Sequence, residues 1–154
     1  MSDPKRDLMR HFLATLAYRA RKTIVEAPAD FGAFSAAGKT PSAILSHMGD
    51  LLAWSISWFD EQRWKPANGV NWEENVTRFF TLLQELDALL ASAAQVRCHN
   101  DERMMQGPLA DAMTHVGQLA MLRRLAGSPT PPENFAEAAV SIGDLSGPAS
   151  PQSV

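Results

Sequence analysis

Four segments of the chain repeat apolar residues at the spacing of one helix face, and this periodicity constrains the fold more than any other feature. The first segment spans residues 3–25, where apolar side chains recur every four residues from Leu8 onward. Similar stripes run through residues 41–61, 71–96 and 108–125. A stripe with this period is buried when its helix packs against other helices. With no convincing strand pattern, the sequence predicts an all-α fold, a four-helix bundle.

Capping residues mark where these helices begin and end. Thr40 followed by Pro41 is typical of an N-cap and a first helical position. Asn71 is the expected N-cap of the third helix, and Pro108 is the expected first residue of the fourth. Gly127 suits the position that ends the fourth helix. Connecting loops are expected at residues 27–39, 63–71 and 98–107.

The length and composition indicate one domain with an extension. A chain of 154 residues can bury a sufficient core without a disulfide or a structural metal. We therefore expect a single domain over residues 1–154. Residues 128–154 are rich in Pro, Gly and Ser and read as a C-terminal extension, with a short helix around 133–139 and an irregular tail over 145–154.

Charge and cysteine content exclude several classes of function. The chain has 14 Lys and Arg against 17 Asp and Glu, which gives no electrostatic reason to expect nucleic acid or an anionic membrane as a partner. Cys98 is the only cysteine, so an intramolecular disulfide and a thiolate zinc cluster are excluded. The N-terminal residues lack the apolar core of a signal peptide, and no apolar run approaches the roughly 18 residues of a membrane span. These features favour the cytoplasm.

Three residues form the best candidate site. Asp111 and His115 are four positions apart in the fourth helix and therefore lie on one face. If the second and fourth helices converge, His47 completes a set of two histidines and one carboxylate, which can hold a metal ion and leave positions open for water or substrate. The alternative is structural. Asp111 would then be an acid in a helix first turn, paired with His115 at the surface, and His47 would be a hydrogen-bonded packing residue.

Aromatic residues near His47 suggest a pocket. The candidate pocket residues are Leu51, Trp54 and Trp58, on the same stripe as His47, and Gln118, three residues after His115. Together with Trp64 and Trp72, these tryptophans could line a ligand pocket, or they could belong to the core or to a subunit contact. Cys98 and His99 form a weaker candidate pair, for which the sequence supplies no partner.

Several strings resemble the DinB/YfiT-like superfamily. They are ILSHMGDLLAWS in the second helix, DAMTHVGQLAMLRRLAGSP in the fourth, RHFLATLAYRARKTI in the first and PENFAEAAVSIG after the fourth. The resemblance covers most of the chain, and the HVGQL segment is its most specific part.

This resemblance implies a bundle with up-down-down-up topology that is often dimeric. It also implies a site for nickel or zinc with one histidine in helix two and an H-x-x-x-H pair in helix four. By position, His47 and His115 match two of these ligands, and Asp111 replaces the third. A hard, anionic oxygen in place of an imidazole changes the metal preference, so iron or manganese also comes into consideration.

Two functions are compatible with these features. Members of the superfamily include thiol-dependent transferases and isomerases that use mycothiol, bacillithiol or glutathione. By resemblance, the chain is expected to be a metal-dependent thiol transferase or hydrolase acting on a small molecule, possessing a divalent metal ion and forming a homodimer. The alternative is a non-catalytic bundle that binds a small ligand or takes part in stress-related interactions without a functional metal.

Overall fold

The computed structural model describes residues 2–36, 38–64, 66–67 and 71–148. Every regular element in these residues is helical. The α-helices are α1 (Pro4–Ile24), α2 (Pro41–Ser57), α3 (Trp72–Ala91), α4 (Asp101–Met104) and α5 (Ala110–Leu125). The shorter elements are the 3₁₀ turns η1 (Phe31–Ala33), η2 (Glu61–Arg63) and η4 (Phe135–Glu137), and the π-helical segment η3 (Met105–Leu109).

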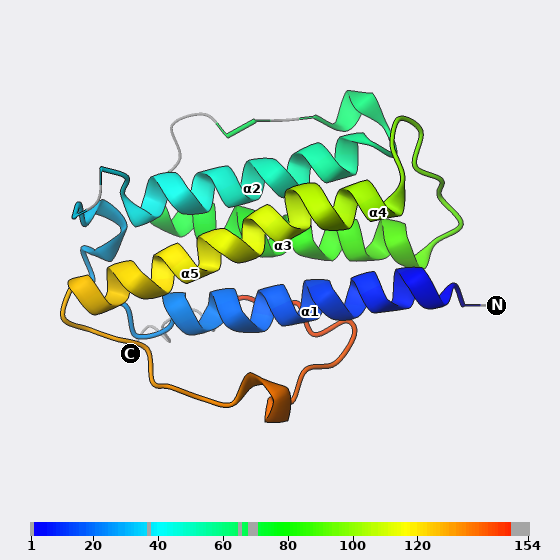
Figure 1. Cartoon of the computed structure of the whole chain (residues 1–154). Helices are drawn as coiled ribbons and strands as arrows, with labels where there is room; N and C mark the ends of the chain where they lie inside the picture. The colour runs from blue at the N-terminus through cyan, green and yellow to red at the C-terminus, as the bar shows by residue number, and fades with distance from the viewer. Residues whose placement is uncertain (1, 37, 65, 68–70, 149–154) are drawn as a thin grey trace, which may run out of the picture.

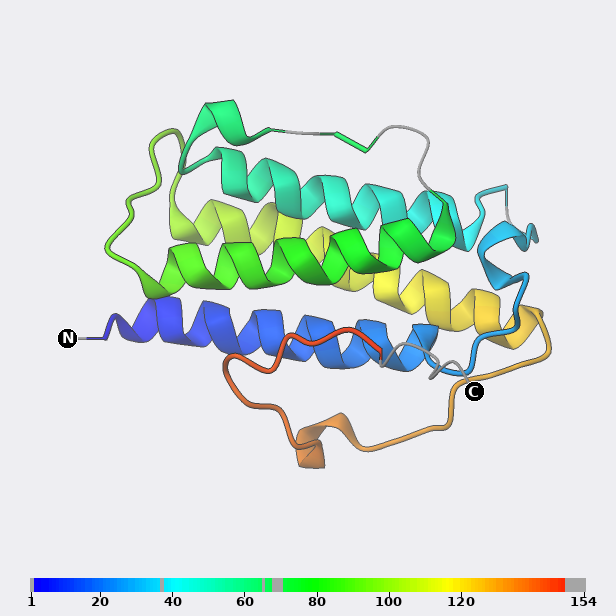
Figure 2. The same ribbon diagram turned by 180° about the vertical axis from the view of Figure 1, so that it is seen from behind.

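The elements α4, η3 and α5 follow one another as a continuous helical rod, so four long rods pack together (Figure 1, Figure 2). In Figure 1, α1 and the α4–η3–α5 rod run from right to left, whereas α2 and α3 run from left to right. The directions along the chain are therefore up, down, down, up. The prediction of an all-helical bundle is confirmed.

The core lies between the inward faces of the four rods. Helix α1 packs against α3 and α5, and α2 packs against the same two helices. The largest fully buried side chains come from every rod and from η1: Leu13, Leu16, Phe31, Leu45, Met48, Leu52, Ile56, Phe79, Leu83, Leu86, Met104 and Leu109. The expected stripe of the first helix was wrong at Leu8, which is 67% exposed. The adjacent Met9 faces the core instead, because the inward face of α1 follows Met9, Leu13 and Leu16.

Two predicted helix starts are confirmed by their capping hydrogen bonds. The Thr40 hydroxyl accepts from the Ala43 amide at 3.2 Å, with Pro41 at the first helical position. Asn71 and Glu74 form a reciprocal capping box, in which each side chain accepts from the other residue's backbone N–H. Such pairs satisfy amide donors that have no partner inside the helix.

Two helices end earlier than expected, and tertiary hydrogen bonds hold the residues that follow them. Helix α2 stops at Ser57 rather than near residue 61, and the Arg97 amide donates to the Trp58 carbonyl at 2.8 Å. Helix α3 stops at Ala91 rather than near residue 96. There the buried Arg6 guanidinium donates to the Ala94 carbonyl at 2.7 Å, holding the chain outside a helical path.

The fourth rod begins earlier than expected. Its N-cap is Asn100, whose side chain accepts from the Arg103 amide at 2.9 Å, so the expected loop over residues 98–107 was wrong beyond residue 100. Pro108 lies inside the rod, within η3. Proline has no N–H and its ring crowds the carbonyl four residues earlier, and the wider π turn accommodates both effects. Asp111 lies in the first turn of α5 as expected, although the π-helical segment η3 continues the rod before it.

The side chain of Arg123, in the last turn of α5, forms hydrogen bonds with two other parts of the chain. It is 3% exposed and donates to the carbonyls of Thr23 and Val25 at 3.0 and 2.9 Å. It also donates to the Glu26 carbonyl at 3.3 Å and to the carbonyl and hydroxyl oxygens of Ser128 at 2.8 and 3.1 Å. Burial lowers the pKa of this guanidinium, and the nearby Glu26 carboxylate opposes this shift only in part. The contacts join the ends of α1 and α5 to the start of the C-terminal extension.

Residues 128–148, here named the strap, follow α5 and pass along the outside of α1 (Figure 2). The short helix expected around residues 133–139 is a single 3₁₀ turn. Leu145, expected in an irregular tail, is 3% exposed and belongs to the core. Residues 149–154 lie outside the described residues, as do parts of the expected loop 63–71. Within the described chain, no helix combines the length and the apolar character that crossing a bilayer requires.

Candidate metal centre

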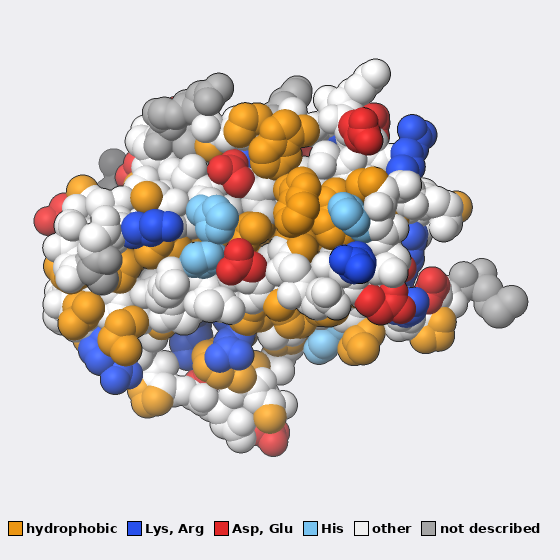
Figure 3. Space-filling model, turned by 45° about the horizontal axis from the view of Figure 1, so that its top comes forward, with side chains coloured by type: hydrophobic (Ala, Val, Ile, Leu, Met, Phe, Trp, Pro, Cys, Tyr) orange, Lys and Arg blue, Asp and Glu red, His pale blue; other side chains and the backbone are white. Residues whose placement is uncertain are grey.

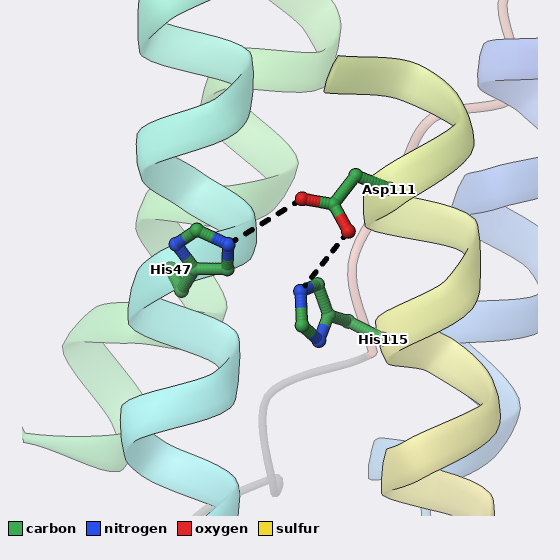
Figure 4. Close-up of side chains that lie close together, drawn as sticks. All are labelled: His47, Asp111 and His115. Atoms are coloured by element: carbon green, nitrogen blue, oxygen red, sulfur yellow. Dashed lines mark ion pairs between the residues drawn. The ribbon is translucent and has the colours of Figure 1, made fainter. Parts of the chain in front are cut away.

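Helices α2 and α5 bring the three candidate ligands together. His47 lies in the second turn of α2, and Asp111 and His115 lie one turn apart in α5, immediately after the π-helical segment. All three side chains point into the space between the two helices (Figure 4). Their potential ligand atoms lie within 4.8 Å of one another. The convergence on which the sequence interpretation depended is therefore present.

The Asp111 carboxylate lies between the two imidazoles. Its Oδ2 atom is 3.6 Å from His47 Nε2, and its Oδ1 atom is 3.4 Å from His115 Nε2. The two imidazole rings have their centroids 4.8 Å apart and stand at 90° to one another. Both nitrogen–oxygen distances exceed the usual length of a hydrogen bond, 2.7 to about 3.2 Å.

These separations resemble those of ligands around a common cation. Two atoms that each lie about 2.1 Å from a metal ion are about 3.0 Å apart at a right angle and about 3.4 Å apart at the tetrahedral angle. The two nitrogen–oxygen distances, 3.4 and 3.6 Å, are close to the tetrahedral value, and each involves a different oxygen of the carboxylate. With one ligand atom from each residue, the separations reach up to 4.8 Å, so binding one ion requires the side chains to move inward by about 1 Å or more. The side chain of His47, 47% exposed, has room for this movement.

Gln118 sets the orientation of the His115 ring. Its Oε1 atom lies 2.7 Å from His115 Nδ1, and an amide oxygen can only accept a hydrogen bond. With this assignment of the amide group, Nδ1 carries the proton and donates it. Nε2 then keeps its lone pair and faces Asp111. A metal-ligating histidine commonly has its second nitrogen fixed in this way.

The site opens to solvent on one side. The side chains of His47 and Asp111 are 47% and 46% exposed, whereas that of His115 is 13% exposed. Figure 3 shows two adjacent histidine side chains on this face, beside an acidic side chain and a patch of hydrophobic ones. An ion held by the three residues would therefore remain accessible to water or to a small molecule.

The aromatic stripe predicted on α2 divides into exposed and buried parts. Trp54 is 43% exposed, whereas Leu51 and Trp58 are 9% and 3% exposed and belong to the core. The rings of Trp54 and Trp58 lie edge to face with centroids 5.0 Å apart. The ring of His99 lies beside that of Trp58, with centroids 4.2 Å apart. Trp54 is thus the member of the predicted pocket stripe that offers most surface to a ligand.

The contacts of Gln118 and His99 were not predicted from the sequence. Gln118 was a candidate pocket residue, and the structure places it as the hydrogen-bond partner of His115. The available signal was its spacing, since residues three apart on a helix are neighbours. His99 extends the aromatic stripe from the α3–α4 connection, a contact that no local pattern could indicate. Trp72 packs separately against Phe31, with centroids 5.6 Å apart.

Comparison with models of known families, with curated proteins and with solved structures finds no match for this chain. The function is therefore inferred from the geometry of His47, Asp111 and His115, and from the resemblance of the sequence strings described above.

Proposed function

We propose that this chain is a divalent-metal-binding protein of the DinB/YfiT-like type that acts as a metal-dependent thiol transferase or hydrolase on a small molecule. The observation that supports the proposal is the convergence of three donor side chains from two helices. His47, Asp111 and His115 place their potential ligand atoms within 4.8 Å of one another, on a solvent-accessible face.

The chemistry of the donor set fits a divalent transition metal. Two imidazole nitrogens suit zinc, nickel and iron, and one carboxylate oxygen adds affinity for harder ions such as manganese. Three protein ligands leave at least one coordination position for an exchangeable group, as in catalytic rather than structural sites. The carboxylate also lowers the net charge of the site by one unit relative to a set of three neutral histidines.

The chain's own residues would hold, orient and shield the reacting groups. His115, fixed by its hydrogen bond to Gln118, would present Nε2 in one orientation, and the more exposed His47 would adjust to the ion. A bound divalent metal lowers the pKa of a coordinated thiol or water, which supplies a nucleophile at neutral pH. The exposed face of Trp54, two helical turns along α2, would contact the apolar part of a small substrate.

The competing proposal is a non-catalytic bundle that uses the same residues as a charge cluster. If either histidine is protonated, its Nε2 and the Asp111 carboxylate form a partly exposed ion pair. Such pairs contribute about 1 kcal/mol or less. In this case the three residues would affect stability slightly and would not bind a metal.

Metal content separates the two proposals. The full chain is purified without a histidine tag or nickel resin, and bound metals are measured by mass spectrometry for the wild type, His47→Ala and Asp111→Ala. The metal proposal predicts near one equivalent in the wild type and strong loss in both variants. His11→Ala is the matched control, because this exposed histidine lies on α1, away from the site. Less than about 0.1 equivalent in the wild type, or equal loading in all variants, contradicts the metal proposal.

Activity requires a separate test. Transfer of glutathione to a model aromatic electrophile, and hydrolysis of a model ester, are measured with metal-loaded wild type and with His47→Ala. The proposed function predicts turnover by the wild type alone in one of these reactions. Metal binding without turnover across several thiols and electrophiles would favour a binding function.

The proposed homodimer is tested by light scattering. The chain has a mass of 16.8 kDa, so a dimer would scatter as about twice this value. A single monomeric species at micromolar concentration would contradict the dimer.

A further inference from the structure

A groove lies between α1, α5 and the strap, on a different side of α5 from the candidate metal centre. Its volume is about 710 Å³, within the roughly 300–1,000 Å³ that is typical of small-molecule sites. The α5 wall is apolar and is formed by Met113, Val116 and Ala120, and the strap closes the other side with Pro129–Pro132 and Phe135. An apolar body could therefore lie along α5 under the strap.

The groove and the metal centre use opposite faces of one helix. At about 100° per residue, the side chains of Met113, Val116 and Ala120 point in directions about 165° from those of Asp111, His115 and Gln118. The groove is therefore a separate candidate site that does not depend on the proposed metal or on its chemistry.

Basic side chains line the rim of the groove. Arg19 and Lys22 come from α1, and Arg124 comes from the last turn of α5. Glu133 is the acidic residue lining the groove, and its carboxylate is already engaged by Lys22 at 2.5 Å and by the Tyr18 hydroxyl at 2.7 Å. The residues that line the groove therefore include three cationic side chains and one carboxylate.

Two of these cations have capacity for an anion. Among the described residues, neither Arg19 nor Arg124 has a carboxylate within ion-pair distance. The Cζ atom of Arg19 lies 3.9 Å from the centroid of the Phe135 ring. This cation–π contact does not use the N–H groups of the guanidinium, which can still donate to an anion. Arg124 is exposed.

We propose that this groove binds a small amphipathic anion, with its apolar body against α5 and its carboxylate, sulfonate or phosphate group at Arg19 and Arg124. The apolar wall supplies most of the binding free energy, and the two guanidinium groups select for negative charge. The strap forms one wall and is held to α1 by Glu133, so the site exists only while the strap is docked.

The test uses two fluorescent probes that differ in one charged group. These are the anion 1-anilinonaphthalene-8-sulfonate and its neutral parent N-phenyl-1-naphthylamine, each titrated into the metal-free full chain at low salt. We expect the anion to bind about 10-fold more tightly, and Arg19→Gln or Arg124→Gln to weaken it about 5-fold while leaving the neutral probe unchanged. Arg97→Gln is the matched control, because this exposed arginine lies outside the groove.

A groove-filling variant tests the location independently. Gly117 lines the groove, and a Cβ atom added there has no heavy atom within 4 Å. Leucine also favours the helix more than glycine does, so Gly117→Leu should fold and should weaken both probes about 10-fold or more. Circular dichroism checks the fold of each variant. Equal affinity for the two probes, or binding unchanged by Arg124→Gln or Gly117→Leu, would overturn the proposal.

Discussion

Replacing Arg123 with alanine should destabilise the bundle strongly, although no acidic side chain is lost as its partner. Five hydrogen bonds would disappear, and the carbonyls of Thr23, Val25 and Glu26 would lose their donor. Hydrogen bonds to a charged group contribute about 1.5 kcal/mol each, and relief from burying the guanidinium offsets somewhat more than half of the total. We expect a net loss of about 3 kcal/mol in the free energy of unfolding.

Urea unfolding followed by circular dichroism measures this loss. With an m value of about 2 kcal/mol per molar urea, the midpoint should fall by about 1.5 M. Arg124→Ala is the matched control, because the neighbouring residue is exposed and should change the stability by less than about 0.5 kcal/mol. The urea midpoint of Arg123→Lys should lie between those of the two alanine variants, because an ammonium group cannot donate in all the directions in which a guanidinium does. Equal midpoints for Arg123→Ala and Arg124→Ala would contradict a stabilising role of the Arg123 hydrogen bonds.

Three further predictions follow from single contacts. Gly32→Ala would place a Cβ atom 2.7 Å from the Cβ of Trp72, and this overpacking should cost about 2 kcal/mol and lower the melting temperature by about 6 °C in calorimetry. The Lys22 hydrogen bond holds the pKa of Glu133 below its usual 4.5, so this strap contact stabilises the fold above that pH and is lost as the pH falls through the lowered pKa. Carboxyl-carbon NMR should show a Glu133 midpoint below 4.5 that rises in Lys22→Met, and an unchanged midpoint would contradict the assignment. Gln118→Ala should weaken zinc binding about 10-fold or more in a competition titration by releasing the His115 ring, and unchanged affinity would remove Gln118 from the site.

Local signals in the sequence account for the helices that begin with a cap. Thr40 with Pro41, and Asn71 with Glu74, act through contacts within one turn, so the local pattern contains all the information needed. The start of the fourth rod was misplaced because Gly107 and Pro108 are strong helix breakers. Asn100 followed by two acids was the better signal, but a π turn that accommodates proline depends on packing across the bundle.

The candidate site was predictable as a set of residues but not as a geometry. The four-residue spacing of Asp111 and His115 guarantees a shared helix face, and nothing local fixes where His47 lies relative to them. Their convergence depends on how α2 packs on α5. Leu145 shows the same limit, because a Pro- and Gly-rich segment gives no periodicity by which one buried residue can be recognised.

The most direct test of the proposed metal centre is anomalous diffraction from a crystal of the untagged full chain equilibrated with zinc. A metal centre at this position would give one strong peak about 2.0–2.2 Å from His47 Nε2, His115 Nε2 and a carboxylate oxygen of Asp111. No peak between these three side chains, or zinc bound only at other histidines such as His11 or His99, would contradict it.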